Sequence, residues 1–134
     1  MIARPARRVL VTDATSRVTV CSTGFVANTF LLRFVGLLGK RSIAPEEGLL
    51  IKPSSGVHTF GMRFPIDIVA LDKRNRVLGA WSNIGPWKIR GLGLRTRSIL
   101  ELAPGRIDQC RITRGDQLCF APIPARNLSS SSLR

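Results

Sequence analysis

The histidine at position 58 is the only one in the chain, and it precedes an apolar segment that contains Asp67. In a strand, Asp67 shares its face with the apolar residues two and four positions further on, so its carboxylate is expected beside the core. A buried carboxylate needs partners, and His58 or Arg63 could provide them. An aspartate that orients an imidazole would leave the imidazole free to act as a base or ligand donor. His58 and Asp67 are therefore the candidate catalytic residues of a hydrolase-like activity.

A structural interpretation of the same residues is that Asp67 caps backbone amides while His58 packs at a strand end. A wider set of residues could still form a binding site. Glu101 points away from its leucine neighbours and could face His58 or Arg63 across a barrel. We expect a non-enzymatic binding or accessory module for a small ligand or a peptide, with a site formed by His58, Phe60, Met62, Arg63, Asp67 and Glu101. For the apolar members the alternative is ordinary core.

Charge suggests another binding function. The chain has 21 Lys and Arg residues against 8 Asp and Glu, a net charge of +13, which attracts polyanions at long range. The local concentration is the segment 87–97, where Trp87 is followed by Lys88, Arg90, Arg95 and Arg97. Such a loop could bind phosphates or stack a base, which would make the protein a weak polyanion or nucleic-acid binder. The alternative is a solvated loop in an arginine-biased sequence.

Other chemistries find no support in the residue spacing. Cys21, Cys110 and Cys119 lack the two-residue spacing of zinc knuckles and redox pairs, so free thiols are expected, with no metal and no cofactor. The sequence contains no phosphate-binding loop, dinucleotide fingerprint or nucleophile elbow. Its longest apolar run, 30–38, is much shorter than the ~20 residues needed to cross a bilayer, and no signal peptide is visible. We expect a cytoplasmic protein without membrane insertion.

The elements that would position these residues are mostly short strands. Period-two alternation and turn residues predict strands near 8–12, 17–23, 48–52, 57–61, 66–72, 76–84, 98–103 and 117–121. The first two strands should pair as a hairpin, as should those on either side of the polar turn 72–76. One helix is predicted at about 29–38. The pattern indicates a single mainly β domain over 1–125, a compact antiparallel barrel or sandwich, followed by a disordered tail over 126–134.

Five segments in a fixed order also carry a resemblance to a known family. They are Arg33-Phe-Val-Gly-Leu-Leu38, Glu46-Glu-Gly-Leu-Leu-Ile-Lys-Pro53, the segment from His58 to Asp72, Ser98-Ile-Leu-Glu-Leu-Ala-Pro-Gly105 and Ile112-Thr-Arg-Gly-Asp-Gln-Leu118. Together they resemble the bacterial and archaeal domain-of-unknown-function family 192 over roughly residues 26 to 121. The resemblance implies a β-rich fold and brings no established activity. Family relatives often carry an aromatic residue where this chain has Gly61.

Overall fold

The computed structural model describes residues 7–27, 42–60 and 62–124. These residues form nine strands and one short helix, in the order β1 (Arg7–Asp13), β2 (Val18–Ala27), β3 (Glu47–Ile51), β4 (Val57–His58), β5 (Ile66–Leu71), β6 (Val77–Ile84), β7 (Ile89–Arg90), β8 (Ser98–Leu102), α2 (Arg106–Cys110) and β9 (Leu118–Pro122).

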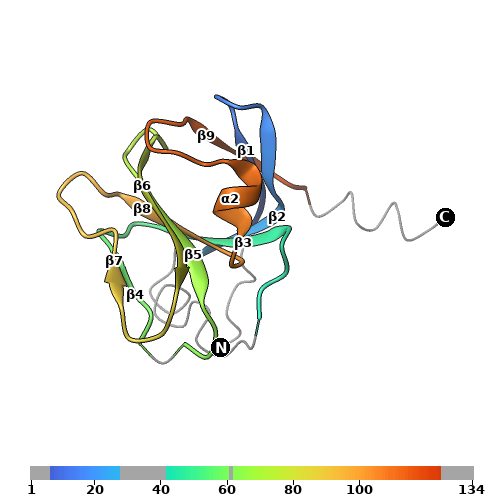
Figure 1. The fold of residues 1–134 in the computed structure, drawn as a ribbon. Helices are drawn as coiled ribbons and strands as arrows, with labels where there is room; N and C mark the ends of the chain where they lie inside the picture. Colours follow the sequence, from blue (N-terminus) through green and yellow to red (C-terminus); the bar gives the residue numbers. More distant parts are fainter. Residues whose placement is uncertain (1–6, 28–41, 61, 125–134) are drawn as a thin grey trace, which may run out of the picture.

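Seven of the strands form one curled sheet with the order β6-β5-β8-β3-β2-β1-β9, and β4 pairs with β7 in a small second sheet. The large sheet bends into a half-barrel (Figure 1), and a bridge between Arg76 and Gln117 links the beginning of β6 to the beginning of β9. All of the strand pairs are antiparallel except β2 with β3, which is parallel. The mainly β prediction is confirmed, and the parallel pair makes the sheet mixed.

The two hairpins predicted from the sequence are present. Strands β1 and β2 pair around a turn in which the carboxylate of Asp13 accepts hydrogen bonds from the amides of Thr15 and Ser16. Strands β5 and β6 pair around a turn in which Asp72 plays the same part, accepting from the amides of Arg74 and Arg76 at 2.8 and 3.0 Å. Aspartate is suited to both turns because its short side chain reaches the amides that follow it.

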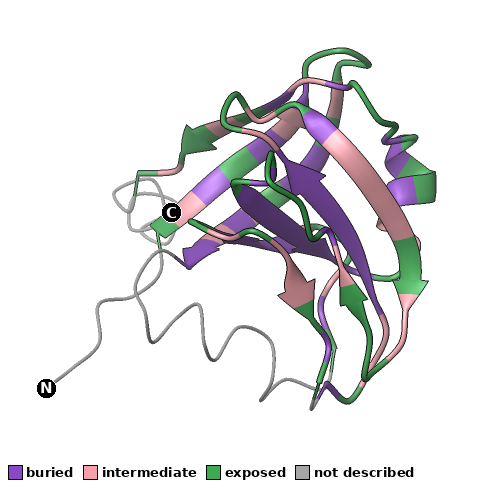
Figure 2. Ribbon diagram, turned by 90° about the vertical axis from the view of Figure 1, so that its left-hand side faces the viewer, coloured by how far each residue is buried: buried purple, intermediate pink, exposed green. Residues whose placement is uncertain are grey.

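Both faces of the central strands are covered, which is why every residue of β5 and of β8 is buried (Figure 2). One face packs Val69 and Leu100 in a cluster that also contains Ile107 of α2. The opposite face packs Ile68 and Ile99 in a second cluster that includes Met62. Side chains alternate along a strand, so neighbouring residues of β5 and β8 belong to different clusters. This alternation decides which of the candidate site residues can meet.

One difference from the predicted elements concerns a helix. The predicted helix at 29–38 and the predicted tail at 126–134 lie outside the described residues. Helix α2 was not predicted, because its five residues are too few to produce a helical period. No helix in the described ranges is long and apolar enough to cross a membrane.

Candidate functional site

Asp67 is completely buried, as predicted, and its partners are backbone amides. The amide of Asn83 donates to Asp67 Oδ1 at 2.7 Å, and the amide of Ile107 donates to Oδ2 at 2.9 Å. Asn83 lies where the register between β5 and β6 slips, in a left-handed conformation with φ of 54°. The slip interrupts the regular hydrogen-bonding ladder, and the carboxylate accepts from one of the amides there.

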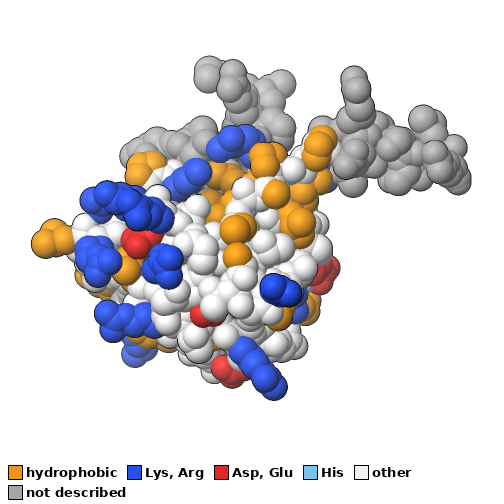
Figure 3. All heavy atoms as spheres, turned by 90° about the horizontal axis from the view of Figure 1, so that it is seen from above, with side chains coloured by type: hydrophobic (Ala, Val, Ile, Leu, Met, Phe, Trp, Pro, Cys, Tyr) orange, Lys and Arg blue, Asp and Glu red, His pale blue; other side chains and the backbone are white. Residues whose placement is uncertain are grey.

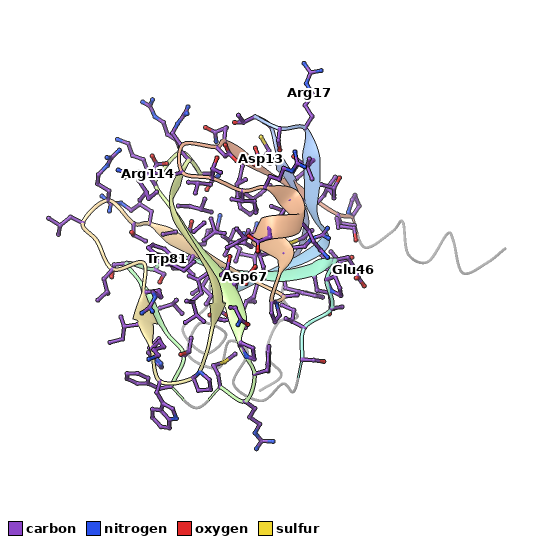
Figure 4. All side chains as sticks on the ribbon, viewed as in Figure 1. Asp13, Arg17, Glu46, Asp67, Trp81 and Arg114 are labelled. Atoms are coloured by element: carbon purple, nitrogen blue, oxygen red, sulfur yellow. The ribbon has the colours of Figure 1, made fainter. Side chains whose placement is uncertain are left out.

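The second amide belongs to the first turn of α2. The residue that caps this helix, Gly105, has no side chain and makes no capping hydrogen bond. First-turn amides of a helix lack partners within the helix, so a buried start needs an acceptor from elsewhere. Asp67 provides that acceptor from a strand 40 residues earlier in the chain, and Figure 4 shows it beside α2. This contact corresponds to the structural interpretation of Asp67 given above.

Glu101 lies on the other face of the sheet. It stands opposite Leu49 of β3 and Ile68 of β5, so its side chain belongs to the side of the second core cluster, away from Asp67. Glu101 is 4% exposed, and its Oε2 has no hydrogen-bond partner among the described residues. Burial raises the pKa of the Glu101 carboxyl to about 8. The sheet therefore separates two carboxylates that were predicted to share one site.

His58 is exposed at the end of β4, where it pairs with Ile89 of β7. Its Nδ1 accepts a hydrogen bond from the amide of Phe60 at 3.3 Å, and its ring lies 4.8 Å from the Phe60 ring. No hydrogen bond or ion pair joins His58 to Asp67 in the part of the chain that the structure describes. Of the other proposed ligand-binding residues, Met62 is buried in the second core cluster and Arg63 is exposed.

Positively charged side chains gather on three loops: the β5–β6 turn, the β7–β8 loop and the loop between α2 and β9. The group consists of six exposed cations, which we call the cationic loop surface: Lys73, Arg74, Arg76, Arg95, Arg97 and Arg114. Seen from above, Lys and Arg side chains gather on the side of the molecule that carries the β5–β6 turn and the β7–β8 loop (Figure 3).

Hydrogen bonds hold these three loops together. The amide of Arg97 donates to the carbonyl of Leu71 at 2.8 Å, which ties the β7–β8 loop to the β5–β6 turn. The guanidinium of Arg76 donates to the carbonyl of Gly115 at 3.1 Å, and the Gly115 amide donates to the carbonyl of Val77 at 2.8 Å. Segments distant in sequence thus present their cations side by side.

Two open hollows adjoin this surface and share Leu94 and Arg95. One, of about 240 Å³, is lined by Asp72, Lys73, Leu94, Arg95 and Arg97. The other, of about 340 Å³, lies over Trp81 and Leu78 and includes Arg114. Asp72 is the carboxylate that lines the smaller of these two hollows. Hydrogen bonds from the amides of Arg76 and Arg74, with the charges of Arg95 and Arg76, hold its pKa below its usual range.

The predicted polyanion loop is therefore divided between two places. Arg95 and Arg97 belong to the cationic loop surface, whereas Arg90 lies in β7 and Lys88 precedes it, beside Phe60 and Trp87. Lys73, Arg74, Arg76 and Arg114 were not among the residues predicted from the sequence. The turn 72–76 was recognised as polar, but only tertiary hydrogen bonds bring it against the other two loops.

Metal and thiol chemistry receive no support from the geometry. No group of three or more His, Cys, Asp or Glu side chains in the described ranges is arranged to hold a metal ion. The three cysteines are free thiols, and Cys21 and Cys110 are buried while Cys119 is exposed. Burial raises the pKa of the Cys21 thiol to about 12, which keeps it protonated and unreactive.

A half-barrel of seven strands with a small second sheet and a short helix defines the fold class. The chain belongs to the DUF192 family (Uncharacterized ACR, COG1430), whose model matches residues 11–120. A search among curated proteins gave no match.

Two crystal structures show the same fold. One is a protein of unknown function from Novosphingobium aromaticivorans, with a TM-score of 0.71 and 22% identity, covering 87% of this chain and 93% of that one. The other is described as a "putative transcription regulator" from Sinorhizobium meliloti, with a TM-score of 0.71 and 21% identity, covering 90% of this chain and 97% of that one. At such identities the likeness concerns the fold alone.

Proposed function

We propose that this protein is a non-enzymatic binding module for a polyanion, with phosphate groups held by the cationic loop surface. The observation that carries the proposal is that hydrogen bonds hold three separate loops together and that these loops carry six exposed cations. Cations at this density attract a chain of phosphates, and each contact is strengthened by release of the counterions bound to that chain.

The cations of this surface fall into two groups, those that also form hydrogen bonds with loop carbonyls and those that do not. Arg76 donates to the carbonyl of Gly115, and Arg97 donates to the carbonyl of Leu94 at 2.7 Å, so these two arginines also shape the loops. No described residue forms a hydrogen bond with the cationic groups of Lys73, Arg95 or Arg114. These three are available to contact phosphate oxygens and are the residues to test first.

The small-ligand or peptide site predicted around His58 and Asp67 is less well supported by the geometry. Both carboxylate oxygens of Asp67 accept hydrogen bonds from backbone amides, and Glu101 lies on the opposite face of the sheet. A hydrolase-like dyad is also disfavoured, because no hydrogen bond or ion pair joins His58 to Asp67 within the described ranges. The "putative transcription regulator" from Sinorhizobium meliloti has a description compatible with nucleic-acid binding, although its identity to this chain carries only the fold.

The test compares two triple variants that remove the same number of charges. Lys73→Gln, Arg95→Gln and Arg114→Gln remove cations from the cationic loop surface. The control carries Arg17→Gln, Arg63→Gln and Arg111→Gln, which are exposed elsewhere. Figure 4 shows Arg17 and Arg114 on different sides of the molecule.

Binding is measured by fluorescence anisotropy with a short labelled oligothymidylate and with labelled inorganic polyphosphate. On a single strand each lost phosphate contact lowers the magnitude of the slope of log K against log salt by about 0.7, so the first variant should lose about 2 from that slope for oligothymidylate. The control variant should keep a slope near that of the wild type. Equal losses in both variants would mean that net charge alone attracts polyanions, and the proposal would be wrong.

A further inference from the structure

Three aromatic rings at the end of the small β4–β7 sheet form a second exposed feature, which we call the aromatic step: His58, Phe60 and Trp87. The rings of Phe60 and Trp87 are stacked, with centroids 5.5 Å apart and planes inclined by 29°. Phe60 is 39% exposed and Trp87 is 70% exposed. Large aromatic side chains usually contribute to stability by being buried, so two stacked rings in contact with water are unexpected.

The fold holds this step firmly through Thr59, which is 1% exposed. Its hydroxyl donates to the carbonyl of Gly85 at 2.7 Å and accepts from the amide of Lys88 at 2.9 Å. The Thr59 carbonyl accepts from the amide of Trp87 at 3.2 Å, and the Thr59 amide donates to the carbonyl of Lys88 at 2.8 Å. These bonds fix the turn that carries Trp87 against the end of β4.

Trp87 also has a strained backbone. Its φ is 66°, in the left-handed region that bulky residues seldom adopt. Such a conformation costs about 1–3 kcal/mol and persists where the surrounding structure imposes it. Here the hydrogen bonds to Thr59 impose it, and the result is an indole directed into solvent. An exposed and strained aromatic residue is a candidate for contact with a ligand.

The surroundings indicate the class of that ligand. Lys88 is exposed and follows Trp87 directly, and Arg90 comes two residues later. Strand β7 then leads into the β7–β8 loop, which carries Arg95 and Arg97 of the cationic loop surface (Figure 1). Aromatic rings available for stacking, combined with cations on the same segment, are a means by which proteins bind single-stranded nucleic acid without reading its sequence. A duplex keeps its bases stacked internally, and polyphosphate has none.

We propose that the polyanion is a single-stranded nucleic acid, whose unpaired bases stack on Trp87 and Phe60 while its phosphates contact the cationic loop surface. This inference rests on the proposed function, because the cations provide the phosphate contacts. The stacking contact also requires unpaired bases in the ligand, which the phosphate contacts do not. The ligand can be DNA or RNA, since stacking uses features that both share.

The experiment measures the affinity of Trp87→Ala and Trp87→Phe for oligothymidylate and for inorganic polyphosphate. Stacking contributes about 1–3 kcal/mol per base, so Trp87→Ala should weaken oligothymidylate binding roughly tenfold and leave polyphosphate binding unchanged. Trp87→Phe keeps an aromatic face and should restore most of the affinity. In a Trp81→Phe background, where Trp87 is the only tryptophan, oligothymidylate should quench the fluorescence and polyphosphate should not.

The outcomes separate the two proposals. If the wild type binds both ligands, and Trp87→Ala weakens neither or weakens both equally, the aromatic step does not recognise bases and only this inference fails. If a duplex of the same length binds as tightly as the single strand and quenches Trp87 equally, the inference fails as well. If the wild type binds neither ligand at low salt, the proposed function fails and this inference with it. The quenching experiment needs no change at Trp87, so it gives a result even if Trp87→Ala does not fold.

Discussion

Ionisation of Glu101 should destabilise the protein as the pH rises. Glu101 lies in β8, which pairs with β3 on one side and β5 on the other, and it is 4% exposed with no partner for Oε2 among the described residues. Burial raises its pKa from the usual 4.5 to about 8, because the charged form loses hydration. In the unfolded chain the same carboxyl is in water and ionises at its ordinary pKa.

The size of the effect follows from that difference. One pKa unit corresponds to 1.36 kcal/mol, so a rise from 4.5 to about 8 means that ionised Glu101 costs the folded state on the order of 5 kcal/mol. Below pH 4.5 the group is protonated in both states and costs nothing. Between these pKa values the folded protein holds the proton more tightly, so the free energy of unfolding falls as the pH rises and levels off above about 8.

The assay is urea unfolding of the wild type, Glu101→Gln and a control, Glu46→Gln, from about pH 5 to about pH 9. Glu46 is exposed and lies at the edge of the molecule (Figure 4). Because the amide of Gln does not titrate, the stability gap between Glu101→Gln and the wild type should widen in favour of the variant as the pH rises. The control should follow the wild type throughout. A gap that stays constant with pH, or a variant less stable than the wild type at the alkaline end, would refute the account of Glu101 as a buried acid with a raised pKa.

Two further substitutions test how the loops and the helix are held. Asp67→Asn should lower the free energy of unfolding by about 1–3 kcal/mol, because one of the amides of Asn83 and Ile107 loses its acceptor. An unchanged urea midpoint would contradict this role. Gly91→Ala should lower the free energy of unfolding by more than about 1 kcal/mol and lower the thermal midpoint, because the φ of Gly91 is +77° and the new Cβ would lie 2.8 Å from a core isoleucine. The control Gly85→Ala places its Cβ in open space and should leave the thermal midpoint almost unchanged.

Local sequence patterns predicted much of the fold. Alternation and turn chemistry place the β5–β6 hairpin correctly, because Asp72 accepts from amides within its own turn. The parallel pairing of β2 with β3 is not visible in such patterns, since it joins strands that no short turn connects. Helix α2 was missed for a related reason, because the acceptor for its first turn comes from Asp67 in a distant strand.

The candidate site shows the same limit. Burial of Asp67 could be predicted from strand alternation, but the identity of its partners could not, because both are backbone amides brought close by tertiary structure. The side of the sheet on which Glu101 falls depends on the register of β8 against β5, which the sequence does not specify. The cationic loop surface is also a tertiary feature. Arg95 and Arg97 were selected from one dense segment, whereas Arg114 becomes their neighbour only in the folded chain.

The central claim is that phosphates bind the cationic loop surface, and the most direct measurement is the change in backbone amide chemical shifts as oligothymidylate is added to the ¹⁵N-labelled protein. We predict that the largest changes fall in 72–76, 93–97 and 113–116, with a second group at 58–60 and 85–90. Shifts spread evenly over exposed arginines such as Arg17 and Arg111, or no shifts at low salt, would contradict the claim.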